Sequence, residues 1–255
     1  MANIKFLLKF GQKAHIESFA SGALYCSNAK TFWGIEETLK IKGQGDRLEA
    51  GSRFFAQRIS IYDNEDGSLL GVLPTTSGLV HYEPAEEIPV FCLFAVYDED
   101  CVTENDGTIK ISLSEGIKQT IREHFPNADT VAIIDDPKRF LLDIENSIGC
   151  EVKHGLVQYY NIDKGFLRDD GTRAIDMEYM RYLTQDVPPV VEGNKKRYVF
   201  NAEYVYRCLL CKDVYFKDEQ EYRIILLNEK ITNGEIYSVR FTHGIHVMDL
   251  EMFLK

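Results

Sequence analysis

The sequence has no long apolar run, no excess of basic charge and no repeated or low-complexity segment. Its apolar runs all fall short of the roughly 20 residues that cross a bilayer, so we expect no membrane partner. The N-terminal stretch carries Lys5 and Lys9 within a short apolar segment, which is unlike a secretory signal peptide and predicts a cytoplasmic location. The net charge of −11 makes nucleic acid an unexpected partner, because a phosphate backbone attracts basic surfaces, whereas a basic protein partner would suit it.

Metal-binding and nucleotide-binding signatures are also scarce. Cys208 and Cys211 have the C-x-x-C spacing, but no second pair of Cys or His follows at zinc-site spacing. We therefore expect no metal site and predict that both sulfurs lie on the apolar face of a helix and pack in the core. Gly43, Gly45 and Gly51 frame a charged segment that matches neither glycine-rich nucleotide pattern. This segment is either a plain surface loop or a loop that approaches a ligand or another chain.

The composition itself is that of a globular protein, with 45% hydrophobic and 27% charged residues. We predict one α+β domain over residues 1–255, with a mixed, mainly antiparallel sheet and flanking helices. Apolar runs predict strands over residues 4–10, 23–26, 53–62, 68–73, 90–97, 129–134, 151–160, 222–227, 235–241 and 245–248. Other patterns predict helices over 14–21, 112–125, 137–148 and 201–212, a polar turn over 27–33, and either a helix or a strand over 177–183.

Three signals predict helix ends. Ser112 and Glu115 have the spacing of a capping box at the start of a helix. Asp136 followed by Pro137 indicates an N-cap with proline at the first helical position. Gly22 is placed to end the first helix, because glycine tolerates the left-handed conformation found after helix C-termini.

The stretch 213–227 is the most informative part of the chain. Glu219 and Glu221 lie two residues apart at the start of the apolar run 222–227, and Arg223 is the next residue of the same parity. Alternate residues of a strand share a face, so we predict that these three side chains point the same way. Such a group either positions acids for chemistry, or serves as solvated residues and an ion pair at a strand end.

Two parts of the sequence resemble a known family. Lys9-Phe10 at the end of the first strand, His15 in a helix and the run Gly22–Ser27 resemble the beginning of ADP-ribosyltransferase-like folds. Glu219-Gln220-Glu221 resembles the E-x-E motif near the last core strands of those enzymes. The run Glu219–Arg223 also resembles the E-x-E-[WY]-R ending of uncharacterised bacterial and phage proteins. The resemblance covers about a quarter of the chain, and Ser27-Asn28-Ala29 stands in place of the family's Ser-Thr-Ser triplet.

The resemblance implies an NAD-dependent ADP-ribosyltransferase or NAD glycohydrolase, a phage or bacterial protein encoded by a phage or mobile element and acting in host–phage conflict. Breaking the nicotinamide–ribose bond creates an oxocarbenium-like transition state, which a carboxylate beneath the sugar stabilises. Glu221 would take that role and hydrogen-bond a ribose hydroxyl. Glu219 would orient or deprotonate the acceptor.

The resemblance also implies a set of NAD-binding residues. Tyr25 and Phe32 would stack on the nicotinamide, and Ser27 would steady the ribose. Lys9 stands where the family has a first-strand Arg or His. His15 and Arg223 complete this set.

Two other functions are compatible with the sequence. One is a non-catalytic binding protein on the same scaffold, which inhibits a host protein or sequesters a nucleotide. The other is a magnesium-dependent nuclease that uses Asp46, Glu49 and the late glutamates, although the lysine that usually follows such acids is missing.

Overall fold

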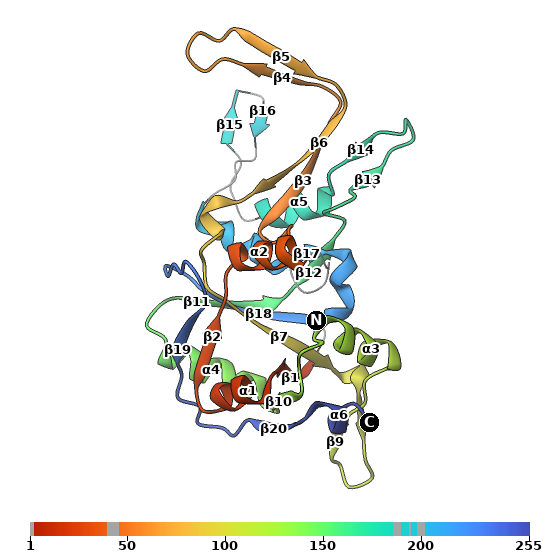
Figure 1. Ribbon diagram of the computed structural model, residues 1–255, viewed down its shortest axis with the longest axis vertical. Coiled ribbons are helices and arrows are strands. Elements are labelled where there is room, and N and C mark those ends of the chain that lie inside the picture. The colour runs from red at the N-terminus through yellow and green to blue at the C-terminus, as the bar shows by residue number, and fades with distance from the viewer. Residues whose placement is uncertain (1–2, 40–45, 186–189, 194, 198–201) are drawn as a thin grey trace.

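A six-stranded sheet forms the centre of the computed structural model, which describes residues 3–39, 46–185, 190–193, 195–197 and 202–255 (Figure 1). Its strand order is β11-β18-β7-β1-β10-β20, and every neighbouring pair is antiparallel. The strands are β1 (Ile4–Gly11), β7 (Val90–Tyr97), β10 (Thr130–Ile134), β11 (Val152–Leu156), β18 (Glu221–Leu226) and β20 (His246–Asp249). The α+β class and the mainly antiparallel sheet are as predicted, and β7 is central as its apolar run indicates.

Helices cover both faces of this sheet because alternate strand residues are apolar on each side. On one face, α1 (Lys13–Ala20) and α4 (Pro137–Ser147) pack on a core that includes Phe91 and Ile224. On the other face, α3 (Glu115–His124) and the C-terminal α6 (Leu250–Phe253) pack on a second core. This second core contains Leu8, Phe10, Phe94, Val96, Leu113, Ile121, Val131, Leu250 and Leu254.

A third core lies on the same face as α3, toward the opposite end of β7 and β18. Its members come from the ends of β7 and β18, from loops, and from short elements: α2 (Ala29–Leu39), η1 (Glu83–Ala85), β12 (Gln158–Tyr160), α5 (Met177–Thr184), η3 (Ala202–Leu210) and β17 (Cys211–Asp213). The 3₁₀ helix η4 (Val214–Glu219) follows β17. Cys208 and Cys211 are both buried here, and their thiols donate to backbone carbonyls of Val205 and Arg207. The predicted core packing of the two sulfurs is confirmed, although Cys211 begins a strand rather than continuing a helix.

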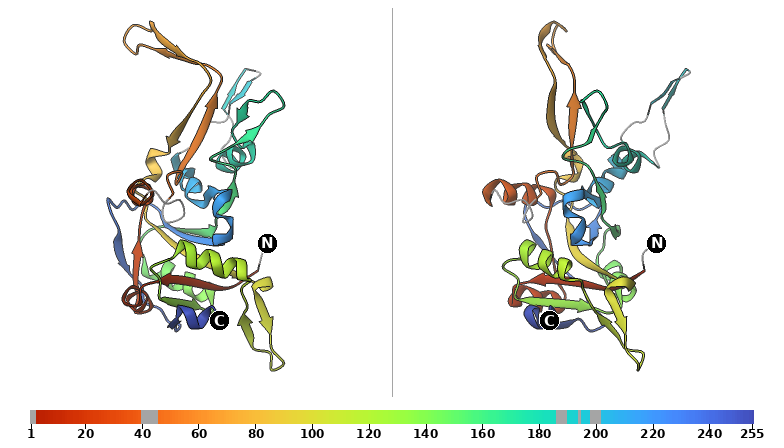
Figure 2. Two further views of the ribbon diagram at one scale, coloured as in Figure 1. Left: turned by 45° about the vertical axis from the view of Figure 1, so that its right-hand side comes forward. Right: turned by 90° about the vertical axis from the view of Figure 1, so that its right-hand side faces the viewer.

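Paired strands outside the main sheet form hairpins and ribbons. In the longest, β3 (Gly51–Ala56) pairs with β6 (Thr76–His81), and β4 (Ile59–Tyr62) pairs with β5 (Leu69–Leu73) beyond them. This ribbon stands out from the rest of the molecule (Figures 1 and 2). The other pairs are β2 (Ala23–Cys26) with β19 (Glu235–Ser238), β8 (Cys101–Thr103) with β9 (Ile109–Ile111), β12 with β17, β13 (Phe166–Leu167) with β14 (Arg173–Ala174), and β15 (Val190–Glu192) with β16 (Lys195–Arg197). The 3₁₀ helix η2 (Asp98–Asp100) joins β7 to β8.

Several local predictions were wrong at element ends. The predicted turn at 27–33 is the start of α2, because the Asn28 side chain accepts a hydrogen bond from the backbone N–H of Thr31 at 3.0 Å and caps the helix. The predicted capping box at Ser112 is not formed. Ser114 caps α3 instead, accepting from the backbone N–H of Ile117 at 3.3 Å. Asp136 and Pro137 begin α4 as predicted.

Longer predicted elements are divided in the structure. The strand predicted over 53–62 is split into β3 and β4, and the strand over 151–160 into β11 and β12. The second piece, β12, leaves the main sheet and pairs in parallel with β17. Residues 177–183 are helical, and the helix predicted over 201–212 is the 3₁₀ helix η3 followed by β17, with residue 201 outside the described part.

Within the described residues, no helix is both long and apolar enough to cross a membrane.

Candidate active site

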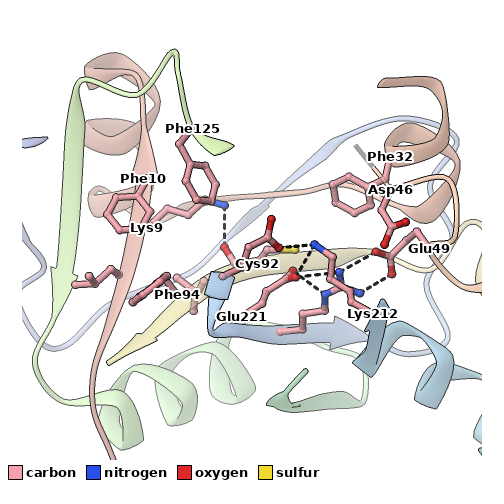
Figure 3. Close-up of a pocket in the computed structure, with 14 residues that line it drawn as sticks. Lys9, Phe10, Phe32, Asp46, Glu49, Cys92, Phe94, Phe125, Lys212 and Glu221 are labelled. Carbon is pink, nitrogen blue, oxygen red and sulfur yellow. Dashed lines mark hydrogen bonds and ion pairs between the residues drawn. The ribbon is translucent and has the colours of Figure 1, made fainter. Parts of the chain in front are cut away.

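The site lies where β1 and β7 separate. These strands pair only as far as Leu8 opposite Phe94, after which β1 continues beside β10 while β7 continues beside β18. Lys9 reaches across the opening, and its Nζ donates to the carbonyl oxygen of Cys92 at 2.8 Å (Figure 3). The separation leaves a gap between two central strands of the sheet.

A cavity of about 120 Å³ occupies this opening on the face that carries α3. Aromatic and aliphatic side chains of the second core form one side, and charged side chains form the other. The lining residues are Leu8, Lys9, Phe10, Phe32, Asp46, Glu49, Cys92, Leu93, Phe94, Phe125, Lys212, Glu219, Glu221 and Arg223. Both predicted catalytic glutamates therefore line one cavity next to the N-terminal strand.

The two glutamates reach the cavity by different routes. Glu221 and Arg223 are alternate residues of β18 and share a face, as predicted, with Arg223 Nε 2.7 Å from Glu221 Oε1. Glu219 is not on the strand, which corrects the expected three-residue face. It is the last residue of η4, and Gln220 adopts a left-handed conformation (φ 41°) that turns the chain before β18 begins. β18 itself lies inside the sheet, between β11 and β7.

Arg223 is the anchor of the charged side of the cavity, with only 1% of its surface exposed. Its guanidinium contacts Glu49 through both terminal nitrogens at 2.5 and 2.8 Å, and Glu221 at 2.7 and 3.2 Å. A further bond reaches the carbonyl oxygen of Leu209 at 2.5 Å. These five bonds match the five N–H donors of a guanidinium, so Arg223 is saturated by the protein. It holds Glu49 and Glu221 in place.

Lys212 links the two predicted catalytic acids. Its Nζ lies 2.5 Å from Glu219 Oε2 and 3.2 Å from Glu221 Oε2. Although burial opposes its charge, the two carboxylates hold the pKa of Lys212 well above its usual value. On the far side, Nδ1 of His124 lies 2.8 Å from Glu219 Oε1. Burial likewise opposes the charge of Glu221, but Arg223 and Lys212 lower its pKa, so Glu221 is ionised at neutral pH.

Asp46 has a different environment in the same cavity. It is only 4% exposed, and its Oδ1 accepts from the backbone N–H of Leu48 at 2.8 Å. Its Oδ2 is buried without a hydrogen-bond partner in the described part of the chain. Burial, and next the negative charge of Glu49, raise the pKa of Asp46 to about 7, against smaller opposing effects from Lys212 and Arg223. Asp46 and Glu221 are thus carboxyls with strongly different affinities for a proton.

The remaining predicted binding residues are divided between two cavities. Phe32 and Arg223 line the cavity of about 120 Å³ that contains the four acidic side chains, here called the carboxylate cavity. His15 and Tyr25 line a second cavity of about 520 Å³ on the α1 face of the sheet, and Lys9 lines both. Ser27 is absent from the described lining of both. Its backbone instead forms a bridge with Val90, with N–O distances of 2.9 and 2.7 Å.

Sequence reasoning gave less weight to three residues that complete the site. Asp46 and Glu49 belong to the glycine-framed segment, predicted as a surface loop or a loop that approaches a ligand or another chain, and to the nuclease alternative. Lys212 is the last residue of a predicted helix. The sequence does show that these three residues are charged residues within apolar or glycine-flanked segments. That signal does not reveal which distant residue each of them contacts. Among the described residues, no three His, Cys, Asp or Glu side chains are grouped so that they would hold a metal ion.

Comparisons with known proteins leave the function to be argued from this geometry. No family model, no curated protein and no solved structure matches the chain. The resemblance to ADP-ribosyltransferase-like folds therefore stays a prediction from short motifs. The contacts within the cavity are independent of it.

Proposed function

We propose that this protein cleaves the nicotinamide–ribose bond of NAD, as an ADP-ribosyltransferase or an NAD glycohydrolase. The observation that supports this most is the pair Glu219 and Glu221, held by Lys212 in one cavity where β1 and β7 separate. The carboxylate cavity suits a group about the size of a sugar ring. The neighbouring cavity of about 520 Å³ lies within the roughly 300–1,000 Å³ range of ligand pockets. Lys9 and Phe10 line both, so a dinucleotide bound at the opening would contact them.

Glu221 is the group that favours this chemistry. Positive charge develops on the ribose as nicotinamide leaves, and a fixed, ionised carboxylate stabilises it most when water is excluded. Arg223 and Lys212 keep Glu221 ionised and fix its orientation before substrate binds. Glu219 would orient the acceptor from the other side of Lys212.

The binding residues follow from the same arrangement. Phe32 lines the carboxylate cavity, whereas Tyr25 lines the larger one, so of these two residues Phe32 would stack on the nicotinamide beside Glu221. Tyr25 and His15 would contact the remainder of the dinucleotide. Lys9 would supply positive charge between the two cavities, where a diphosphate attracts it. Arg223 would act indirectly, because its donors are saturated.

The test is release of nicotinamide from NAD by the purified protein, measured by liquid chromatography. We expect turnover by the unaltered chain and a loss of about 10²–10³-fold in Glu221→Gln, in which the charge is removed at constant shape. Glu251→Gln is the control, because Glu251 is an exposed partner of Arg122 outside the cavity, and it should retain full activity. Circular dichroism and NAD binding by calorimetry show whether Glu221→Gln is folded.

Absence of nicotinamide release, with or without a cell extract as a source of acceptors, would contradict the catalytic proposal. Equal rates in Glu221→Gln and the unaltered chain would contradict the role of Glu221.

A non-catalytic protein that sequesters a nucleotide is a second candidate. The observation that favours it is that both carboxylate oxygens of Glu219 and of Glu221 already contact side chains of the protein. An acid saturated in this way is less available to a substrate. Binding of NAD in calorimetry without nicotinamide release would support this candidate over the enzyme.

A further inference from the structure

The cavity is lined by four carboxylates and three cationic side chains, and Asp46 is the carboxylate without a cationic partner among the described residues. Three cations line the cavity, namely Lys9, Lys212 and Arg223. Three carboxylates have cationic partners: Glu49 contacts Arg223, Glu219 contacts Lys212, and Glu221 contacts both. Asp46 also lines the cavity, yet its carboxylate has no ion pair among the described residues.

The geometry of Asp46 is suited to exchange of a proton. The bond from the Leu48 backbone to Oδ1 fixes the carboxyl group and leaves Oδ2 without a partner within the described chain. In Figure 3, the Asp46 carboxyl lies beneath Phe32 and beside Glu49, on the charged side of the cavity. A buried polar atom without a partner is costly, and such atoms in native proteins call for an explanation such as a catalytic role.

The oxygens of the two paired glutamates are already occupied. Oε1 of Glu219 contacts His124 and Oε2 contacts Lys212, so a proton on either oxygen would displace one of these contacts. Glu221 is in the same position because of Arg223 and Lys212. Among the described carboxylates that line the cavity, Asp46 is the one whose Oδ2 accepts a proton without breaking an ion pair.

We propose that Asp46 is the general base that takes the proton of the acceptor, which is water or a hydroxyl group. The proposal rests on the proposed function. As the C1′–N bond breaks, its electron pair goes to the pyridinium nitrogen and nicotinamide leaves as a neutral molecule, so the leaving group needs no acid. The acceptor oxygen forms the new bond to C1′ and releases its proton to Asp46 Oδ2, from which it passes to solvent. Glu219 then orients the acceptor without binding the proton.

The electrostatic surroundings of Asp46 predict a pH profile. The charges that act on it directly are Glu49, Lys212 and Arg223, and the cavity also contains Lys9, Glu219 and Glu221. Because its pKa is raised to about 7, Asp46 becomes an effective base as the pH rises through neutrality, where general-base catalysis works best. The rate should rise about tenfold per pH unit below 7 and level off above it.

The experiment measures nicotinamide release at saturating NAD from pH 5 to 9, in the unaltered chain and in Asp46→Asn. Asparagine can keep the bond from the Leu48 backbone but cannot accept the proton, so we expect kcat to fall by about 10²–10⁴ with KM nearly unchanged and the step near pH 7 lost. Asp66→Asn is the matched control, because Asp66 Oδ1 accepts a backbone N–H two residues later in the same way but is exposed. His124→Gln should keep the step, which separates the role of Asp46 from that of the imidazole that contacts Glu219.

Each outcome decides between the two proposals. If the unaltered chain releases nicotinamide and Asp46→Asn has the same kcat and pH profile, the role of Asp46 is overturned while the proposed function stands. A raised KM with unchanged kcat assigns Asp46 to substrate binding and also overturns it. If the unaltered chain releases no nicotinamide, both proposals fall together.

Discussion

Replacing Asp46 by Asn should stabilise the protein at neutral and alkaline pH, and the gain should depend on pH. The folded state raises the pKa of Asp46 from 3.8 to about 7, because burial and Glu49 disfavour its negative charge. Between these two values the folded state binds more protons than the unfolded state, so ionisation progressively costs stability as the pH rises. At about 1.4 kcal/mol per pH unit, the cost reaches about 4 kcal/mol above pH 7. Asparagine has no such cost and preserves the shape of the side chain.

Urea denaturation followed by circular dichroism at pH 4, 5, 6, 7 and 8 measures this effect. The difference in unfolding free energy between Asp46→Asn and the unaltered chain should be near zero at pH 4, grow up to pH 7 and stay constant beyond. Asp66→Asn is again the control, because the pKa of the exposed Asp66 is lowered by its hydrogen bonds to Ser68, so no gain at high pH is expected. A gain that is absent, or the same at pH 4 and pH 8, would refute the argument that burial and Glu49 keep Asp46 protonated.

Two further predictions concern stability alone. Glu49→Gln should destabilise the fold by about 3–5 kcal/mol, because it removes a partner of the buried Arg223. The control Glu104→Gln breaks an exposed pair with Lys110 and should cost at most about 1 kcal/mol. Urea denaturation at pH 8 measures both costs, and equal values would contradict the claim that burial makes the Arg223 pair more important. Ser114→Ala should cost about 1 kcal/mol in the same assay through loss of the α3 cap, and a larger cost in Ser112→Ala would mean that the helix begins earlier.

Local sequence patterns predicted the strands that consist of continuous apolar runs. Strands β1, β7 and β18 were predicted nearly to the residue, because continuous apolar runs of this length favour buried strands. The start of α2 was missed because Asn28 can begin either a turn or a helix, and only its bond to Thr31 decides between them. The division of 151–160 was missed because both halves have strand-like residues, and the separate partners of β11 and β12 determine where the strand ends.

The site shows the same division between local and long-range information. The alternation of residues in a strand placed Glu221 and Arg223 on one face, and that relation holds in the structure. Glu219 departs from it because Gln220 is left-handed, which the motif does not reveal. Glu49 and Arg223 are 174 residues apart, and nothing in either segment indicates the other.

By itself, the sequence determined the strands of the main sheet, the helices α1, α3 and α4, and the clustering of acids around residue 220, because these follow from side-chain periodicity over a few residues. The tertiary structure alone decided that β1 and β7 separate, that Glu49 and Lys212 meet the strand acids there, and that Asp46 is buried beside them without a cationic partner among the described residues. The reason is physical: the charge state of a buried carboxyl depends on desolvation and on neighbouring charges, and both are set by which distant segments the fold brings together.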